Sequence, residues 1–241
     1  LDVKVGRGAF MATLEDGRAL AQTMVDIGRD AGRQVIAVLS DMNQPLGEAV
    51  GNALEVGEAL ATLNGGGPAD LREHCLMLAG FMLKLAGRGA KWADPDEVRK
   101  ELARHLDDGS ALAKFRQMVG AQGGDVTMVD DPSKLPQASI KESFDAPQSG
   151  FIAQVAADQI AWGAFELGAG REKKSDALDL AVGLAVHVKV GDRVEQGKSL
   201  VTIYANDAGK IAACRARLQT AFTFSDQPVE PLPLFYDVLS Q

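Results

Sequence analysis

The sequence carries no excess of positive charge and no long apolar segment. Its 241 residues include 25 Lys and Arg against 33 Asp and Glu, which gives a formal net charge of −8 and an isoelectric point near 5.0. Such a surface on average repels the phosphates of nucleic acids and of anionic lipids. No apolar run approaches the roughly 18 residues that a membrane helix requires, and no basic and apolar leader opens the chain. We therefore expect a cytoplasmic protein with neither a nucleic-acid nor a membrane partner.

Cysteine and histidine are also scarce, with two cysteines and three histidines in the whole chain. Neither Cys75 nor Cys214 has a second ligand at a metal-binding spacing, and this low usage is typical of a reducing compartment. His74 precedes Cys75, but adjacent helical residues point in different directions, which favours packing over a joint site. We expect surface or capping roles for His74, His105 and His187, and no Ser-His-acid catalytic arrangement.

What remains is the composition of an ordinary globular protein, 46% hydrophobic with 26 glycines, and a length that can bury a sizeable core. Residues 1–5 alternate like a strand from the first position, so we expect further residues to precede Leu1. A helical pattern over 14–31 and a nearly continuous apolar strand at 34–39 follow. This order of strand, helix and strand predicts an α/β fold, with a parallel or mixed sheet and covering helices.

The rest of the first half is mostly helical in pattern. Further helices are expected at 48–63, 71–85, 94–106 and 110–119. Residues 123–141 are rich in Asp, Pro, Gly and Ser, which predicts an extended connector. We therefore expect three parts: an α/β domain with covering helices at 1–122, the connector at 123–141, and a C-terminal lobe at 142–241.

The C-terminal lobe is expected to contain strands at 144–155 and within 179–204, around a tight turn at 190–192. The segment 190–203 resembles the second half of biotinyl and lipoyl carrier domains, so we expect an α+β lobe that resembles their small barrel. Carrier domains present a modified lysine on an exposed hairpin, and the nearest candidates here are Lys173 and Lys174. A noncatalytic binding or carrier module is therefore the alternative function.

Six motifs along the whole chain carry a resemblance to another family. They are 2–11 (DVKVGRGAFM), 41–47 (DMNQPLG), 49–56 (AVGNALEV), 121–124 (AQGG), 167–171 (LGAGR) and 190–192 (VGD). In this order they closely resemble the pyrimidine-nucleoside and thymidine phosphorylases, of which the chain matches the C-terminal portion. Because the motifs extend from the first residue into the C-terminal region, coincidence does not explain them.

The resemblance implies phosphorolysis of uridine, thymidine or deoxyuridine to the free base and a pentose 1-phosphate, in nucleoside salvage. It also implies inorganic phosphate as the co-substrate, no organic cofactor, and a homodimer. Phosphate requires hydroxyls, backbone N–H groups and a cation, while the departing base requires Arg, Lys or His. Family members supply these groups from motifs that precede the region of Leu1. We therefore assign no catalytic residue here and expect the chain alone to be inactive.

Three residues near the first glycine turn are candidates for the functional site. Lys4 and Arg7 are candidates for catalysis, but a lone Gly-x-Gly after a strand is weak evidence, and the resemblance makes Lys4 a scaffold position. Arg7 departs from the small residue expected between the two glycines. Phe10 matches the apolar position that lines the pyrimidine pocket, where a flat ring buries surface near C5 of the base. Without the resemblance, Phe10 is read as a core aromatic after a turn.

The resemblance also implies a potassium-like cation at Leu46, Ala49 and Glu58. Leu46 and Ala49 are expected in a turn entering a helix, where irregular backbone can direct carbonyl oxygens to one point. Glu58 lies nine residues beyond Ala49 and reaches the same point only if the turn folds back along the helix. Oxygen ligands with one carboxylate suit such a cation better than zinc or copper. The alternative is that Glu58 is an ordinary solvated helix residue.

Overall fold

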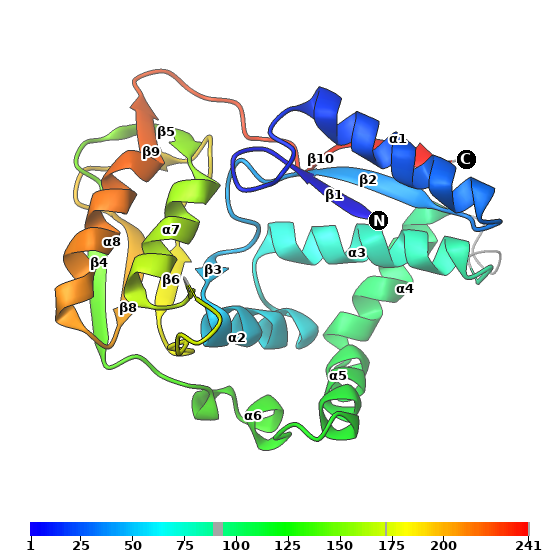
Figure 1. Cartoon of the computed structure of the whole chain (residues 1–241), viewed down its shortest axis with the longest axis horizontal. Helices are drawn as coiled ribbons and strands as arrows, with labels where there is room; N and C mark the ends of the chain where they lie inside the picture. The colour runs from blue at the N-terminus through cyan, green and yellow to red at the C-terminus, as the bar shows by residue number, and fades with distance from the viewer. Residues whose placement is uncertain (89–93, 172, 241) are drawn as a thin grey trace. The chain divides into compact units, whose positions relative to one another are not determined.

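The structure is a computed structural model that describes residues 1–88, 94–171 and 173–240 (Figure 1). The chain forms two compact units, each assembled from separate segments. Unit 1 comprises Leu1–Met42, Leu60–Val126 and Pro233–Gln241, and unit 2 comprises Asn43–Ala59 and Thr127–Leu232. Segments of the two units therefore alternate along the sequence. The domain limits expected at 1–122, 123–141 and 142–241 stay predictions, because compact units do not show which segments fold independently.

Among the described residues, five helices follow one another in the middle of the chain, and the strands come before and after them. The helices are α1 (Leu14–Asp30), α2 (Asn52–Leu63), α3 (Ala69–Leu85), α4 (Pro95–Asp107), α5 (Ser110–Ala121), α6 (Thr127–Asp130), α7 (Ala157–Leu167) and α8 (Ala208–Ala221). The strands are β1 (Asp2–Val5), β2 (Ile36–Asp41), β3 (Ala49–Val50), β4 (Ile140–Asp145), β5 (Gly150–Val155), β6 (Gly183–Val186), β7 (Arg193–Val194), β8 (Ser199–Ala205), β9 (Phe222–Ser225) and β10 (Phe235–Ser240).

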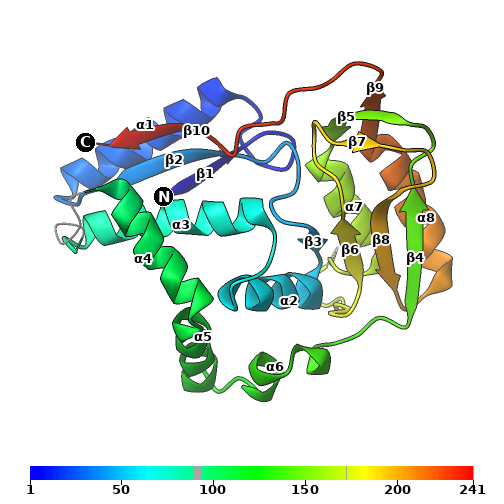
Figure 2. The same ribbon diagram turned by 180° about the vertical axis from the view of Figure 1, so that it is seen from behind.

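Unit 1 is built on a three-stranded sheet in the order β1-β2-β10. β1 and β2 are parallel and β10 is antiparallel to β2, so the expected parallel or mixed sheet is a mixed one. Figure 1 shows α1 on one face of this sheet and α3 on the other, and Figure 2 shows the same layers from behind. α1 begins where the Thr13 side chain accepts a hydrogen bond from the backbone of Asp16, an N-cap that the sequence encodes locally.

Unit 2 contains two sheets, in the orders β3-β6-β8-β4 and β7-β5-β9. Helices α7 and α8 lie side by side (Figure 1), and their buried residues join the strands in one apolar core. The expected barrel is not confirmed, because no closed barrel forms among the described strands. The reason is the pairing of β5, which joins β7 and β9 in a sheet of its own and leaves β4 at the edge of the other sheet.

One expected element starts in a different place. The helix predicted over 48–63 begins only at Asn52, and Ala49 and Val50 form the short strand β3 instead. Gly51 separates the two, with a φ of +144° and an N–H that donates to the Glu55 side chain at 3.0 Å. A Cβ on Gly51 would lie 2.6 Å from the Val182 carbonyl oxygen, so the close approach of two backbone segments fixes this boundary.

A polar network lies between β1 and α3 in unit 1. His74 Nε2 lies 2.8 Å from Asp2 Oδ2 and 3.2 Å from Lys4 Nζ, and Lys4 Nζ is 3.0 Å from the same carboxylate oxygen. The His74 ring also stacks on Phe235 with the ring centres 5.2 Å apart. The surface or capping position expected for His74 is wrong, since the residue is 4% exposed. The ammonium of Lys4 is engaged in this network, as a scaffold role requires.

The carboxylate of Asp2 depends on these partners. Burial by itself raises the pKa of Asp2, but hydrogen bonds from His74, Ser40 and Lys4, together with the charge of Lys4, hold the pKa well below its usual range. The charged form is therefore favoured by folding. Its contribution to the free energy of unfolding is fully present above the unfolded-state pKa of about 3.9 and is lost progressively as the pH falls from there to the lowered pKa of the folded state.

We expect Asp2→Asn to lower the free energy of unfolding at pH 7 by about 1–3 kcal/mol, because charged hydrogen bonds are lost. The difference between the two proteins should shrink at pH 3, where the wild type has lost part of this contribution because the unfolded carboxyl group is then mostly protonated. Urea unfolding at both pH values measures this. Asp30→Asn is the control, since that side chain is 78% exposed. An equal difference at pH 7 and pH 3 would contradict the assignment.

Candidate functional site

The turn formed by residues 43–49 is fixed by hydrogen bonds from three other segments of unit 2. The Ala157 N–H at the start of α7 donates to the Asn43 carbonyl at 3.0 Å. The Val190 N–H donates to Gln44 Oε1 at 2.9 Å. The irregular backbone of the turn is thus tied to other elements of its unit at successive points.

Lys189 supplies two further bonds to the turn. Its Nζ donates to the carbonyl oxygens of Pro45 and Gly47, each at 2.6 Å. Both residues are buried, so their carbonyl groups require partners from within the protein. An ammonium group is suited to this, since it can donate three hydrogen bonds from one point.

Glu58 binds the turn from α2. Its Oε1 accepts hydrogen bonds from the N–H groups of Glu48 and Ala49, at 2.8 and 2.9 Å. The turn therefore folds back along the helix, as the cation hypothesis required, and Glu58 is more than a solvated helix residue. Gly47 lies against the same carboxylate, because a Cβ at this position would lie 2.2 Å from Glu58 Oε2.

The register of β3 shows where the Ala49 carbonyl points. The Val186 N–H donates to the Glu48 carbonyl at 2.8 Å, so the next pair, Ala49 and Ala185, is a non-hydrogen-bonded one. In such a pair the N–H and the C=O both face away from the partner strand. The Ala49 N–H does so and reaches Glu58, which places the Ala49 carbonyl on the Glu58 side at the open edge of the sheet.

Leu46 completes the predicted set. Among the described residues, no group donates a hydrogen bond to the Leu46 carbonyl, while the Pro45 and Gly47 carbonyls on either side bind Lys189. Within the described ranges no three His, Cys, Asp or Glu side chains gather as they do around a transition metal. One carboxylate and backbone oxygens are the donors that fit a weakly charged, hard cation. The structure thus brings Ala49 and Glu58 together on one side of the turn.

Phe10 lies in a loop of unit 1 that follows the carboxyl end of β1. The Gly6 N–H donates to the Met11 carbonyl at 2.9 Å, and the Gly8 N–H donates to the Met42 carbonyl at 2.8 Å, which fixes the loop. The side chain of Phe10 is fully exposed, so it is not the core aromatic of the alternative interpretation. A fixed loop with an exposed ring is a surface on which a flat ligand can stack.

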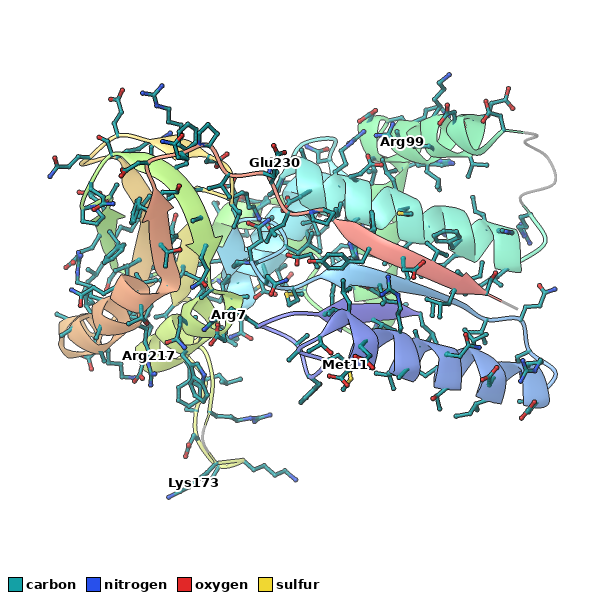
Figure 3. All side chains as sticks on the ribbon, turned by 90° about the horizontal axis from the view of Figure 1, so that it is seen from above. Arg7, Met11, Arg99, Lys173, Arg217 and Glu230 are labelled. Carbon is teal, nitrogen blue, oxygen red and sulfur yellow. The ribbon has the colours of Figure 1, made fainter. Side chains whose placement is uncertain are left out.

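The lysines considered for a carrier role lie elsewhere in unit 2. Lys173 and Lys174 are exposed in the segment that joins α7 to β6, and Figure 3 shows the Lys173 side chain extending away from the ribbon. This segment connects a helix to a strand, whereas a carrier domain presents its lysine on a hairpin between two strands. The placement of these lysines gives the carrier alternative no support.

Comparisons with known proteins match most of the chain. Residues 1–112 match the model of the glycosyl transferase family a/b domain, and residues 151–225 match that of the pyrimidine nucleoside phosphorylase C-terminal domain. A pyrimidine-nucleoside phosphorylase of Geobacillus stearothermophilus is 47% identical over 240 residues, which are 100% of this chain and 54% of that protein. One of Bacillus subtilis is 53% identical over 207 residues, 86% of this chain and 47% of that protein. The chain belongs to the pyrimidine-nucleoside phosphorylase family.

The chain spans about half the length of the curated relatives that it matches. The residues that form and hold the turn described above fall within the matches to both family models. Residues 43–49 and Glu58 fall within the a/b domain match, and Lys189 falls within the C-terminal domain match. The role of Lys189 could not be read from the sequence, because nothing near it marks a partner more than 140 residues away. Within the described residues, no helix is long and apolar enough to cross a bilayer.

We expect Gly47→Ala to displace the Glu58 carboxylate and to lower the free energy of unfolding by about 1–3 kcal/mol, because the new methyl group overlaps Oε2. Gly47 has a φ of +69° and Gly197 a φ of +85°, and at Gly197 an added Cβ meets nothing within 4 Å. Gly197→Ala therefore controls for backbone strain in the same unit. Denaturant unfolding of both variants tests this, and equal losses would show that the contact with Glu58 has no effect.

Proposed function

We propose that this chain is part of an enzyme that cleaves pyrimidine nucleosides with phosphate, to the free base and a pentose 1-phosphate. The observation that carries the proposal is the ordered match of both family models, together with relatives named pyrimidine-nucleoside phosphorylase that align over 86–100% of the chain. In this reaction a phosphate oxygen bonds to C1′ of the sugar as the C1′–N bond breaks, and the electron pair of that bond leaves with the base.

Phe10 is the residue of this chain that we place against the substrate. Its exposed ring, on a loop fixed by two backbone hydrogen bonds, offers an apolar face to a pyrimidine. Burial of that face favours binding and tolerates a methyl group at C5, so both uridine and thymidine fit. No group that binds phosphate or protonates the base is assigned to this chain. A homodimer, action in the cytoplasm and the absence of an organic cofactor are parts of the same proposal.

The test uses a polypeptide of the relatives' full length that carries this sequence. It should release uracil from uridine, or thymine from thymidine, only when phosphate is present, and the 241-residue chain alone should not. Phe10→Ala should lower kcat/KM by about 5- to 150-fold, which corresponds to the loss of roughly 1–3 kcal/mol of apolar contact. Base release is followed by ultraviolet absorbance.

The control for Phe10→Ala is Met118→Ala, which removes another exposed apolar side chain. Release of base without phosphate would overturn phosphorolysis. Turnover by the 241-residue chain would show that the chain itself holds the catalytic groups. Unchanged kinetics of Phe10→Ala with both nucleosides would remove Phe10 from the site.

The second part of the proposal is a monovalent cation, such as potassium, held by the Leu46 and Ala49 carbonyls and the Glu58 carboxylate. Three observations support it. The Ala49 carbonyl lies on the Glu58 side of β3, Glu58 is held at the turn by two N–H groups, and no described group donates to the Leu46 carbonyl. When bound, the cation would supply positive charge that fixes the turn, and the chemistry at the sugar does not pass through it.

We expect potassium chloride to raise the thermal unfolding midpoint above its value in choline chloride of equal concentration, since a ligand of the folded state stabilises it. Glu58→Gln should abolish most of this increment, because the carboxylate supplies the only negative charge in the proposed ligand set. Glu195→Gln, at an exposed residue of the same unit, should retain it. Equal increments in the wild type and Glu58→Gln would refute the cation site.

A further inference from the structure

Lys189 joins two distant parts of unit 2 through its side chain. Its Nζ donates to the carbonyl oxygens of Pro45 and Gly47, the residues directly before and after Leu46. Each bond is 2.6 Å long, and both carbonyl groups belong to buried residues. The ammonium therefore occupies one acceptor site on two of the three successive carbonyls of the turn, which makes these two oxygens weaker ligands for a mobile ion.

The backbone around Lys189 is held firmly. Val188 and Val190, on either side, are 2% and 5% exposed and belong to the apolar core of the unit. The Lys189 N–H donates to Asp192 Oδ2 at 2.8 Å, and the Gly191 N–H donates to the Ile152 carbonyl at 2.9 Å. Because the Cα of Lys189 is fixed by packing on both sides, its ammonium can act as a fixed point for the turn.

Lys189 and Glu58, which carry opposite charges, both contact Gly47 in the turn. Gly47 touches both groups: its carbonyl binds Lys189 Nζ, and a Cβ at this position would lie 2.2 Å from Glu58 Oε2. A positive charge at this distance partly offsets the single carboxylate.

We propose that Lys189 is the positioning residue of the cation site: it binds the carbonyls that flank Leu46, so that the Leu46 carbonyl is left for the ion. This inference rests on the cation site proposed above. Lys189 acts through the turn and does not itself bind the ion. A lysine at this position has two effects, since it fixes the carbonyls and lowers the negative charge of the site.

The test measures amide hydrogen exchange of the 241-residue chain in peptides covering 44–50. Without potassium, Lys189→Met should raise exchange of the Glu48 and Ala49 amides at least tenfold, because the turn loses its two bonds to the ammonium. In the wild type, potassium chloride should slow exchange of these amides relative to choline chloride. For Lys189→Met the potassium concentration that gives half of this effect should rise at least tenfold. Lys189→Arg keeps the charge and the hydrogen-bond donors, so its exchange rates and its potassium response should be close to those of the wild type.

Lys198→Met is the matched control, since Lys198 is an exposed lysine of the same unit, and it should change neither result. Unchanged exchange and unchanged potassium response in Lys189→Met would overturn the positioning role. Faster exchange in Lys189→Met with an unchanged half-effect concentration would also overturn it, because Lys189 would then be structural only. If Glu58→Gln keeps the full potassium response, the proposed cation site is wrong. This outcome can be told apart from a failure of the Lys189 role alone, because the Glu58→Gln protein still contains Lys189.

Discussion

The need to satisfy the polar backbone of one irregular turn governs unit 2. Residues 43–48 form neither a helix nor a strand, and Ala49 opens the two-residue strand β3, so the N–H and C=O groups of this segment cannot all pair within the turn. Lys189 binds two of the carbonyls and Glu58 binds two of the N–H groups. Both side chains come from outside the turn, and each is ionised, which makes its hydrogen bonds stronger than neutral ones. The conformation of the turn thus depends on two distant charges.

Sheet register connects this turn to the rest of the unit. β3 is only two residues long and lies at a sheet edge, so its inner side pairs with β6 and its outer side is left to α2. The pairing of Glu48 with Val186 decides which side each later group faces. Without this register the Ala49 N–H would not reach Glu58. A shift by one residue would turn the N–H and carbonyl groups of Ala49 toward β6 and break the bond to Glu58.

Much of the local structure could be predicted because the signals are local. The helix from Leu14 begins at Thr13, and the helix from Pro95 begins at an Asp94 side chain that accepts from the Asp96 N–H, both as their capping residues indicate. The start of α2 could not be predicted, because Gly51 is placed by contact with the backbone at Val182. The expected barrel was not confirmed for a similar reason. The strands of the lobe pair with partners distant in sequence, and the resemblance of one short segment to a barrel motif does not determine these pairings. Lys189 was missed because its partners are distant in sequence.

Both units use charged side chains in hydrogen bonds, but the two arrangements bind different groups. In unit 1, Asp2 receives hydrogen bonds from His74, Ser40 and Lys4, so each oxygen of its carboxylate is used within the fold. These bonds hold α3 against β1, although His74 Nδ1 is buried and has no hydrogen-bond partner among the described residues. In unit 2, Lys189 and Glu58 bind backbone groups of the turn. A charged side chain that binds backbone groups fixes the course of the chain between them, and Lys189 and Glu58 do this for residues 45–49. The bonds to Asp2 instead join side chains of β1, β2 and α3 and hold these elements together.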